Sequence, residues 1–140
     1  MEKRIVRTDN APAAIGPYEQ GVGAGAFLYT SGQIALDPKT GTFMGGEIEQ
    51  ETERVLKNIE AILQADGLSL ADVVKTTVYL ADLDHFARMN RVYENFFRDS
   101  KPARACVQVA ALPAGAKVEI DAVAVRQTEA GSPLPFRSNR

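Results

Sequence analysis

Residues 47–80 read EIEQETERVLKNIEAILQADGLSLADVVKTTVYL, and this stretch combines a helical pattern with a strand pattern. Its first half carries mostly apolar side chains at the spacing of one helix face: Ile48, Thr52, Val55, Leu56, Ile59, Ile62 and Leu63. Glutamates crowd its start, where the helix dipole favours negative charge, and Gly67 is a suitable residue to end it. The β-branched and aromatic run Val73–Leu80 then predicts a strand.

More strands and a second helix are predicted on both sides of this stretch. The strands are expected at residues 3–7, 18–22, 26–30, 103–109 and 117–125. Gly23-Ala24-Gly25 predicts a hairpin turn, and residues 36–46 have the composition of a surface loop. The second helix is expected to begin near Asp82 or Asp84, with one face formed by Phe86, Met89, Asn90, Tyr93, Phe96 and Phe97. The order β-β-β-α-β-α-β-β predicts an α+β domain.

The last predicted strand indicates how the two faces of the sheet differ. One row of its side chains is wholly apolar, and it contains Val118, Ile120, Ala122 and Ala124. The opposite row mixes charged and apolar residues, namely Lys117, Glu119, Asp121, Val123 and Val125. Since two helices can cover only one face of such a sheet, the partly apolar second face predicts a homo-oligomer in which sheets meet.

Length and composition limit the class of protein. The 140 residues suffice for one domain, expected over residues 1–127, and the polar segment 128–140 is expected to be a disordered tail. The net charge of −2 argues against a nucleic-acid partner. There is one cysteine and one histidine, so neither an intrachain disulfide nor a multi-histidine metal site is expected. No apolar run predicts a membrane span or signal peptide, and we expect a cytoplasmic protein.

Arg104 is the first candidate for chemistry because it lies in an otherwise apolar strand directly after a proline. If that strand alternates, Arg104, Cys106 and Gln108 share one face. The planar guanidinium suits a carboxylate ligand, although a salt bridge with an Asp or Glu of the same chain or of another subunit is the simpler structural explanation. Glu119, in the next predicted strand, could exchange a proton near neutral pH if it is partly buried. Its simpler explanation is an ion pair with Arg104 or Lys117.

The remaining candidates are polar residues at strand ends and on the second helix. Asn90 and Tyr18 could each bind a ligand or only support local structure. Cys106 is predicted to be a small buried residue, because no histidine is placed to activate its thiol. His85 is predicted to be a solvated surface residue. The tripeptide SGQ at residues 31–33 could offer backbone N–H groups to an anion, although on its own this motif is unspecific.

Taken together, these pieces resemble the RidA (YjgF) family of reactive-intermediate deaminases. The resemblance rests on APAAIGPYEQGV at residues 11–22, TSGQI at 30–34, LKNIEAIL at 56–63, KTTVYLADLDHF at 75–86, NRVYENFF at 90–97, PARACVQVAALP at 102–113 and KVEIDAVAV at 117–125. The resemblance implies a chorismate-mutase-like fold with a mixed six-stranded sheet, two helices on one face, and a homotrimer with active sites between subunits. It also implies cofactor-independent hydrolysis of small 2-imino acids to 2-oxo acids and ammonia.

The resemblance also assigns roles to individual positions. It makes Arg104 the residue that binds the substrate carboxylate, Glu119 the carboxylate that positions the attacking water, and Cys106 a site residue whose backbone shapes the pocket. The residues that line the rest of the cleft are Tyr18, Ser31, Gly32 and Asn90. One departure is the short connection RDSK between Phe97 and Pro102, which bears on substrate size.

The sequence is also compatible with an alternative function. A trimer of the same kind could bind 2-oxo acids or amino acids through Arg104 without catalysing a reaction. Glu119 favours the enzyme, because binding a carboxylate does not require a second carboxylate nearby. RNA cleavage, a further role known among such proteins, is the least compatible with the acidic charge balance and the single histidine.

Overall fold

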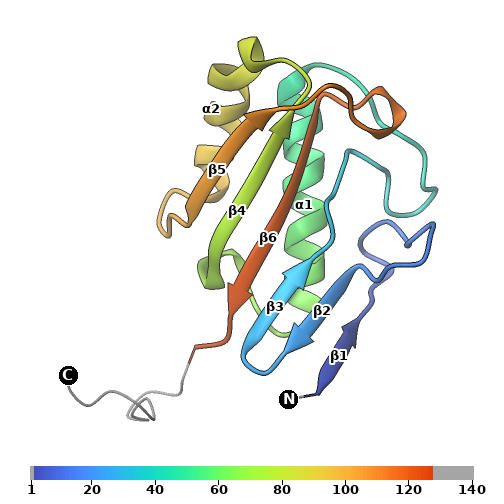
Figure 1. The fold of residues 1–140 in the computed structure, drawn as a ribbon, viewed down its shortest axis with the longest axis vertical. Coiled ribbons are helices and arrows are strands. Elements are labelled where there is room, and N and C mark those ends of the chain that lie inside the picture. The colour runs from blue at the N-terminus through green and yellow to red at the C-terminus, as the bar shows by residue number, and fades with distance from the viewer. Residues whose placement is uncertain (1, 128–140) are drawn as a thin grey trace.

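Helix α1 (Ile48–Ala65) is the main support of the sheet in the computed structural model, which describes residues 2–127 (Figure 1). The backbone N–H of Glu47 donates to the side chain of Gln50 at 2.9 Å and closes the first turn. Gly67 has a φ of +74°, so it ends the helix in the left-handed conformation that glycine adopts without strain. The predicted apolar face is fully buried, and both predicted helix ends are confirmed.

Six strands form one sheet in the order β1-β2-β3-β6-β4-β5. Their bounds are Lys3–Val6 for β1, Gly21–Ala24 for β2, Phe27–Thr30 for β3, Val73–Leu80 for β4, Ala103–Gln108 for β5 and Val118–Val125 for β6. Strands β4 and β5 pair in parallel, and every other neighbouring pair is antiparallel. Strand β6, the last in the chain, therefore lies between β3 and β4. The predicted mixed six-stranded sheet is confirmed.

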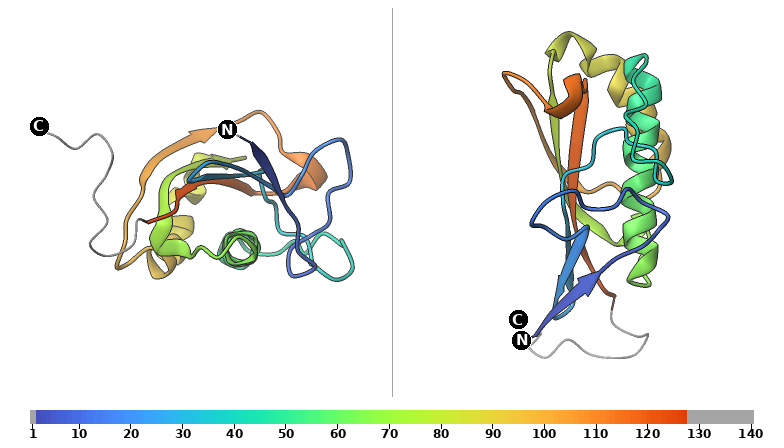
Figure 2. Two further views of the ribbon diagram at one scale, coloured as in Figure 1. Left: turned by 90° about the horizontal axis from the view of Figure 1, so that it is seen from below. Right: turned by 90° about the vertical axis from the view of Figure 1, so that its right-hand side faces the viewer.

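Both helices lie on the same face of the sheet, as the edge-on view in Figure 2 shows. Helix α1 connects β3 to β4, and α2 (Phe86–Phe96) connects β4 to the parallel strand β5. Crossovers of the same hand place their helices on one face. The core forms between them, where Leu28, Val78 and Ile120 of the strands are fully buried together with the apolar face of α1.

The opposite face of the sheet carries no helix, and much of it is apolar. Residues of β6 alternate between buried and half-buried, as the two predicted rows require. Phe27 and Tyr29 of β3 pair with Val125 and Val123 of β6 on this open face, and the two aromatic side chains are 43% and 48% exposed. Val107 of β5 is 43% exposed. Within the described residues, the face thus has the composition of a surface that packs against a partner.

The start of β2 and the position of the hairpin turn differ from the sequence predictions. Strand β2 begins at Gly21 rather than residue 18, because the backbone and side chains before it bind the neighbouring loop. The hairpin turn is Gly25-Ala26, one position beyond the predicted centre, and Gly25 has a φ of +60°. The predicted tail, 128–140, lies outside the described residues. Across residues 2–127, no helix combines the length and the apolar character that crossing a membrane requires.

Candidate active site

Arg104 extends from edge strand β5 over helix α2. It pairs in register with Thr76 of β4, whose side chain is buried under the helices, so Arg104 belongs to the helix-covered face of the sheet. Its Nη1 donates a 2.7 Å hydrogen bond to Oδ1 of Asn90. Among residues 2–127, none of the ion pairs includes Arg104. The simpler explanation, a salt bridge with an Asp or Glu, is therefore wrong within one chain.

Cys106 and Gln108 lie on the same side of β5 as Arg104, which confirms the predicted alternation. Gln108 Oε1 accepts the backbone N–H of Leu83, at the start of the α2 region, at 2.8 Å. Cys106 is half-buried and packs against the core. Burial raises the pKa of the Cys106 thiol, and the positive charge of Arg104 only partly opposes this rise. The thiol is therefore a poor source of thiolate, as predicted from the sequence.

Glu119 lies on the other face of the sheet, the one without helices. It pairs in register with Tyr79 of β4, between the buried positions Val118 and Ile120. Burial raises the pKa of the Glu119 carboxyl, and the charge of Asp121 raises it further. Lys117, one of its two predicted partners, instead contacts the buried Glu51, which accepts the Lys117 backbone N–H at 2.9 Å. The predicted ion pairs of Glu119 with Arg104 or Lys117 are absent from the described residues.

Glu119, Tyr18 and Gly32 line the same pocket, which has a volume of about 270 Å³. Gly32 is the second residue after β3 and faces the Glu119 carboxyl group at close range. Tyr18 is 47% exposed, and its hydroxyl accepts the backbone N–H of Ile15 at 3.3 Å. Ser31 anchors the Tyr18 segment, since its hydroxyl donates to the Glu19 carbonyl and its N–H donates to the Gln20 carbonyl.

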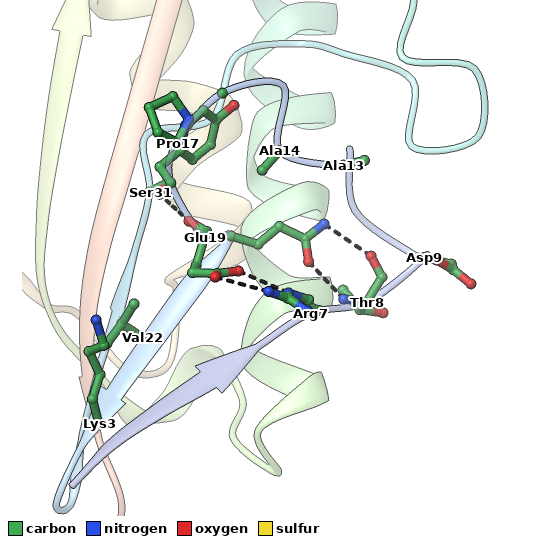
Figure 3. Close-up of a pocket in the computed structure, with 13 residues that line it drawn as sticks. Lys3, Arg7, Thr8, Asp9, Ala13, Ala14, Pro17, Glu19, Val22 and Ser31 are labelled. Carbon is green, nitrogen blue, oxygen red and sulfur yellow. Dashed lines mark hydrogen bonds and ion pairs between the residues drawn. The ribbon is translucent and has the colours of Figure 1, made fainter.

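A larger cleft of about 840 Å³, whose lining residues are drawn in Figure 3, adjoins this pocket. Ala13, Tyr18 and Gln20 line both, whereas Ser31 lines only the larger cleft. Arg7 and Glu19 form a two-point ion pair at 2.9 and 3.0 Å along its wall. These hydrogen bonds raise the pKa of Arg7 and lower that of Glu19. The sequence carried no signal for this pair, because its two members lie 12 residues apart in an irregular segment.

Gln20 holds the loop that leads to Tyr18, and its place in the sequence does not indicate this role. Its buried side-chain amide donates to the carbonyls of Thr8, Ala11 and Pro12 and accepts the Thr8 N–H at 2.7 Å. The loop that leads to Tyr18 is thereby tied to the start of β2. A glutamine directly before a strand is unremarkable in sequence, since its burial follows only from the path of the loop.

The seven predicted site residues thus form two separate groups in one chain. Arg104, Asn90 and Cys106 belong to the β5–α2 edge, whereas Tyr18, Ser31, Gly32 and Glu119 lie around the start of β6. Strand β4 separates β5 from β6, and Arg104 and Glu119 point to opposite faces of the sheet. The expectation that Glu119 lies beside Arg104 is therefore wrong for one chain, because the strand order places another strand between them.

His85 differs from its prediction as a solvated surface residue. It is half-buried in the turn before α2, and its Nδ1 atom is buried without a hydrogen-bond partner among residues 2–127. The turn is capped by Asp82, whose carboxylate accepts the Asp84 N–H at 2.9 Å. Asp82, one of the two predicted helix starts, thus caps the turn that leads into the helix, and α2 itself begins at Phe86. The turn folds the His85 ring inward, which its position after a capping residue did not indicate.

On the role that the family resemblance implies for Glu119, replacing Gly32 with alanine is expected to lower turnover about tenfold or more, with only a small loss of thermal stability. The new Cβ would lie 2.9 Å from the carboxyl carbon of Glu119 and closer still to one oxygen, so the carboxylate has to move. Gly46→Ala is the steric control, because its Cβ displaces the polar end of Gln50, which caps α1 and does not line the pocket of Glu119. Melting curves and steady-state kinetics on both variants check this; equal turnover in the two would contradict it.

The family follows from comparison with known proteins. A family model described as endoribonuclease L-PSP matches residues 8–126 of the chain. The chain belongs to this family. It is the family of RidA and YjgF, so the resemblance inferred from the motifs is confirmed.

Relatives with curated names and solved structures agree over most of the chain. The 2-iminobutanoate/2-iminopropanoate deaminase of Salmonella typhimurium is 49% identical over 127 residues, covering 89% of this chain and 98% of the relative. The mouse protein of the same name is 48% identical over 124 residues, covering 89% and 92%. The crystal structure of E. coli TdcF with bound serine matches with a TM-score of 0.85 and 46% identity, covering 89% of this chain and 99% of that one.

Proposed function

We propose that this RidA-family protein hydrolyses small 2-imino acids, such as 2-iminobutanoate and 2-iminopropanoate, to 2-oxo acids and ammonia. The observation that carries the proposal is Arg104, which is held by Asn90 and has no acidic partner among residues 2–127. A positioned guanidinium of this kind suits a carboxylate ligand. The deaminase names of relatives at 48–49% identity support the same chemistry.

The proposed mechanism needs an anchor, a water molecule and a carboxylate. Arg104 binds the substrate carboxylate and orients the C=N carbon, which is already electrophilic and requires no metal or cofactor. Glu119 accepts a proton from water as its oxygen attacks that carbon, and a C–O bond forms while the C=N π electrons move to nitrogen. That proton passes to the nitrogen and leaves a carbon that carries both a hydroxyl and an amino group. Glu119 then transfers the hydroxyl proton to the amino nitrogen, the C=O double bond forms as the C–N bond breaks, and ammonia leaves the 2-oxo acid. The raised pKa of Glu119 suits a group that both takes and returns a proton.

We further propose that one cleft combines Arg104 of one subunit with Glu119 of another in a homotrimer. Two observations support this arrangement: the two residues lie on opposite faces of one chain, and the uncovered sheet face is partly apolar. Tyr18, Ser31 and Gly32 then line the same cleft as Glu119, and Asn90 and Cys106 enter with Arg104.

Sedimentation equilibrium at micromolar concentration is expected to show three times the 15.2 kDa mass of the chain. Burial of the open apolar sheet face between subunits supplies the driving force for association. A monomer at these concentrations would contradict the trimer, and it would remove the shared cleft as well.

Cys106→Ala is expected to keep most of the activity. The thiol has a raised pKa and only the backbone at this position is assigned to the pocket. Steady-state turnover and treatment with a thiol alkylator check this assignment. Complete loss of turnover in an intact oligomer would make Cys106 a nucleophile and would contradict the mechanism above.

The proposed function is tested by a coupled assay. Threonine dehydratase or an amino-acid oxidase generates the imine, and semicarbazide traps it while this protein is added in increasing amounts. The deaminase is expected to lower semicarbazone formation in proportion to its concentration. Unchanged trapping combined with binding of 2-oxobutanoate would favour the second candidate, a non-catalytic binding protein for 2-oxo or amino acids. Serine in the related TdcF structure is the observation that favours this alternative.

A further inference from the structure

Two aromatic rings of α2 lie against the guanidinium of Arg104, and the proposed reaction does not use them. The central carbon of the guanidinium is 4.7 Å from the centre of the Tyr93 ring and 5.4 Å from the centre of the Phe86 ring. Both distances are within the ~6 Å over which a ring face attracts a cation. Asn90 completes the surroundings through its hydrogen bond to Nη1.

One face of α2 presents these three side chains to Arg104. Phe86, Asn90 and Tyr93 are spaced i, i+4 and i+7 along the helix, so they point in the same direction. The helix therefore offers a ring, an amide and a second ring in sequence along the guanidinium. Asn90, between the two aromatic residues, accepts one N–H of the arginine.

The Tyr93 ring is held in place by Thr76 and Phe97. Its hydroxyl shares a 2.6 Å hydrogen bond with Oγ1 of the buried Thr76, and its ring centre lies 4.7 Å from that of Phe97. Thr76 is the register partner of Arg104 across the β4–β5 pair. The Tyr93 ring is thus bonded to β4, and Arg104 belongs to the neighbouring strand β5 at the same register position. The pairing of the two strands therefore keeps the ring and the guanidinium at a nearly constant separation.

Phe86 is the more exposed of the two rings. It is the first residue of α2 and is 37% exposed, whereas Tyr93 is 6% exposed. Arg104 is the cation that lies over its face. Replacement of Phe86 by a smaller side chain would therefore leave the core intact and alter chiefly the surroundings of the guanidinium.

We propose that Phe86 and Tyr93 are positioning residues for Arg104 and that they select a planar carboxylate as its ligand. With Nη1 bound to Asn90, the edge formed by Nε and Nη2 has no hydrogen-bond partner in residues 2–127. Stacking on the rings keeps that edge directed outward, where two parallel N–H groups match the two oxygens of a carboxylate. The inference rests on the proposed role of Arg104 as the substrate anchor.

The test replaces Phe86 by phenylalanines with one, two and more fluorine atoms, introduced at this position alone. Fluorine withdraws electron density from the ring face and hardly changes its size, so a packing role would not respond. The Kd for 2-oxobutanoate is expected to rise stepwise, by about three- to thirty-fold across the series. The same residues at Phe96, which packs against the core at the end of α2, are the matched control and should leave the Kd unchanged.

A second readout does not depend on any ligand. The Nε–H signal of Arg104 in the NMR spectrum of the ligand-free protein is expected to carry a ring-current shift that decreases along the fluorine series. A constant Kd across the series, or an equal change at Phe96, would overturn the proposal. If the parent protein binds no 2-oxo acid, the proposed function fails by itself, and an Nε–H signal insensitive to fluorination then overturns the aromatic positioning independently.

Discussion

Arg104→Ala is expected to lower kcat/KM for the imino acid by well over tenfold and to abolish tight binding of 2-oxobutanoate. A charge-assisted pair in a cleft shielded from water is worth ~2–5 kcal/mol when one partner is truncated. We expect this variant to lose little thermal stability, because Arg104 takes part in no ion pair within residues 2–127 and lies on an exposed edge strand.

Arg104→Lys separates charge from geometry. Lysine keeps the positive charge and loses the planar fork that matches a carboxylate, so this variant should remain severely impaired. Melting temperature, oligomeric mass and 2-oxobutanoate affinity are measured on the same samples. A variant Arg104→Ala that stays assembled, melts normally and binds the 2-oxo acid as tightly as the parent would disprove the anchor; early melting with or without ligand would make the residue structural.

Glu119→Gln is expected to lower turnover about 10²–10⁴-fold while binding of 2-oxobutanoate is kept. The amide preserves the shape of the side chain and its capacity for hydrogen bonds, but it cannot accept a proton from water. Single-turnover rates and ligand titration on the same protein check this. Near-normal turnover would make Glu119 structural, with backbone carbonyls left to hold the water.

The pH dependence of the parent provides the control for this variant. Because Glu119 acts as a base only when ionised, kcat/KM should fall as the pH drops through its raised pKa. Asp121→Asn removes a negative charge that raises this pKa, so the acid limb should move to lower pH. Tyr79, which donates to Asp121 at 3.2 Å, and Lys75 are the other charged or titratable groups near Asp121. An unchanged limb in the Asp121 variant would contradict Glu119 as the titrating group.

Local periodicity in the sequence determined the elements and their buried faces. The 3.6-residue spacing from Ile48 to Leu63 specified α1 because only one helix face can enter the core, and the alternation in residues 117–125 specified the two faces of β6 for the same reason. The alternation of Arg104, Cys106 and Gln108 followed from strand geometry alone. The motifs added the family, and with it the roles expected of the seven candidate site residues.

The tertiary structure alone decided how those residues relate in space. Because β6 lies between β3 and β4, strand β4 separates Glu119 from Arg104, and the two side chains point to opposite faces of the sheet. No local sequence pattern encodes this strand order, since it depends on which distant strands bury their side chains best together. The close approach of Gly32 to Glu119 joins residues far apart in sequence. The hydrogen bonds of Gln20 to its loop and the stacking of Arg104 on Tyr93 join residues that lie in different segments of the fold and share no local pattern. These contacts arise when the packed layers bring the segments together, and so they appear only in the folded chain.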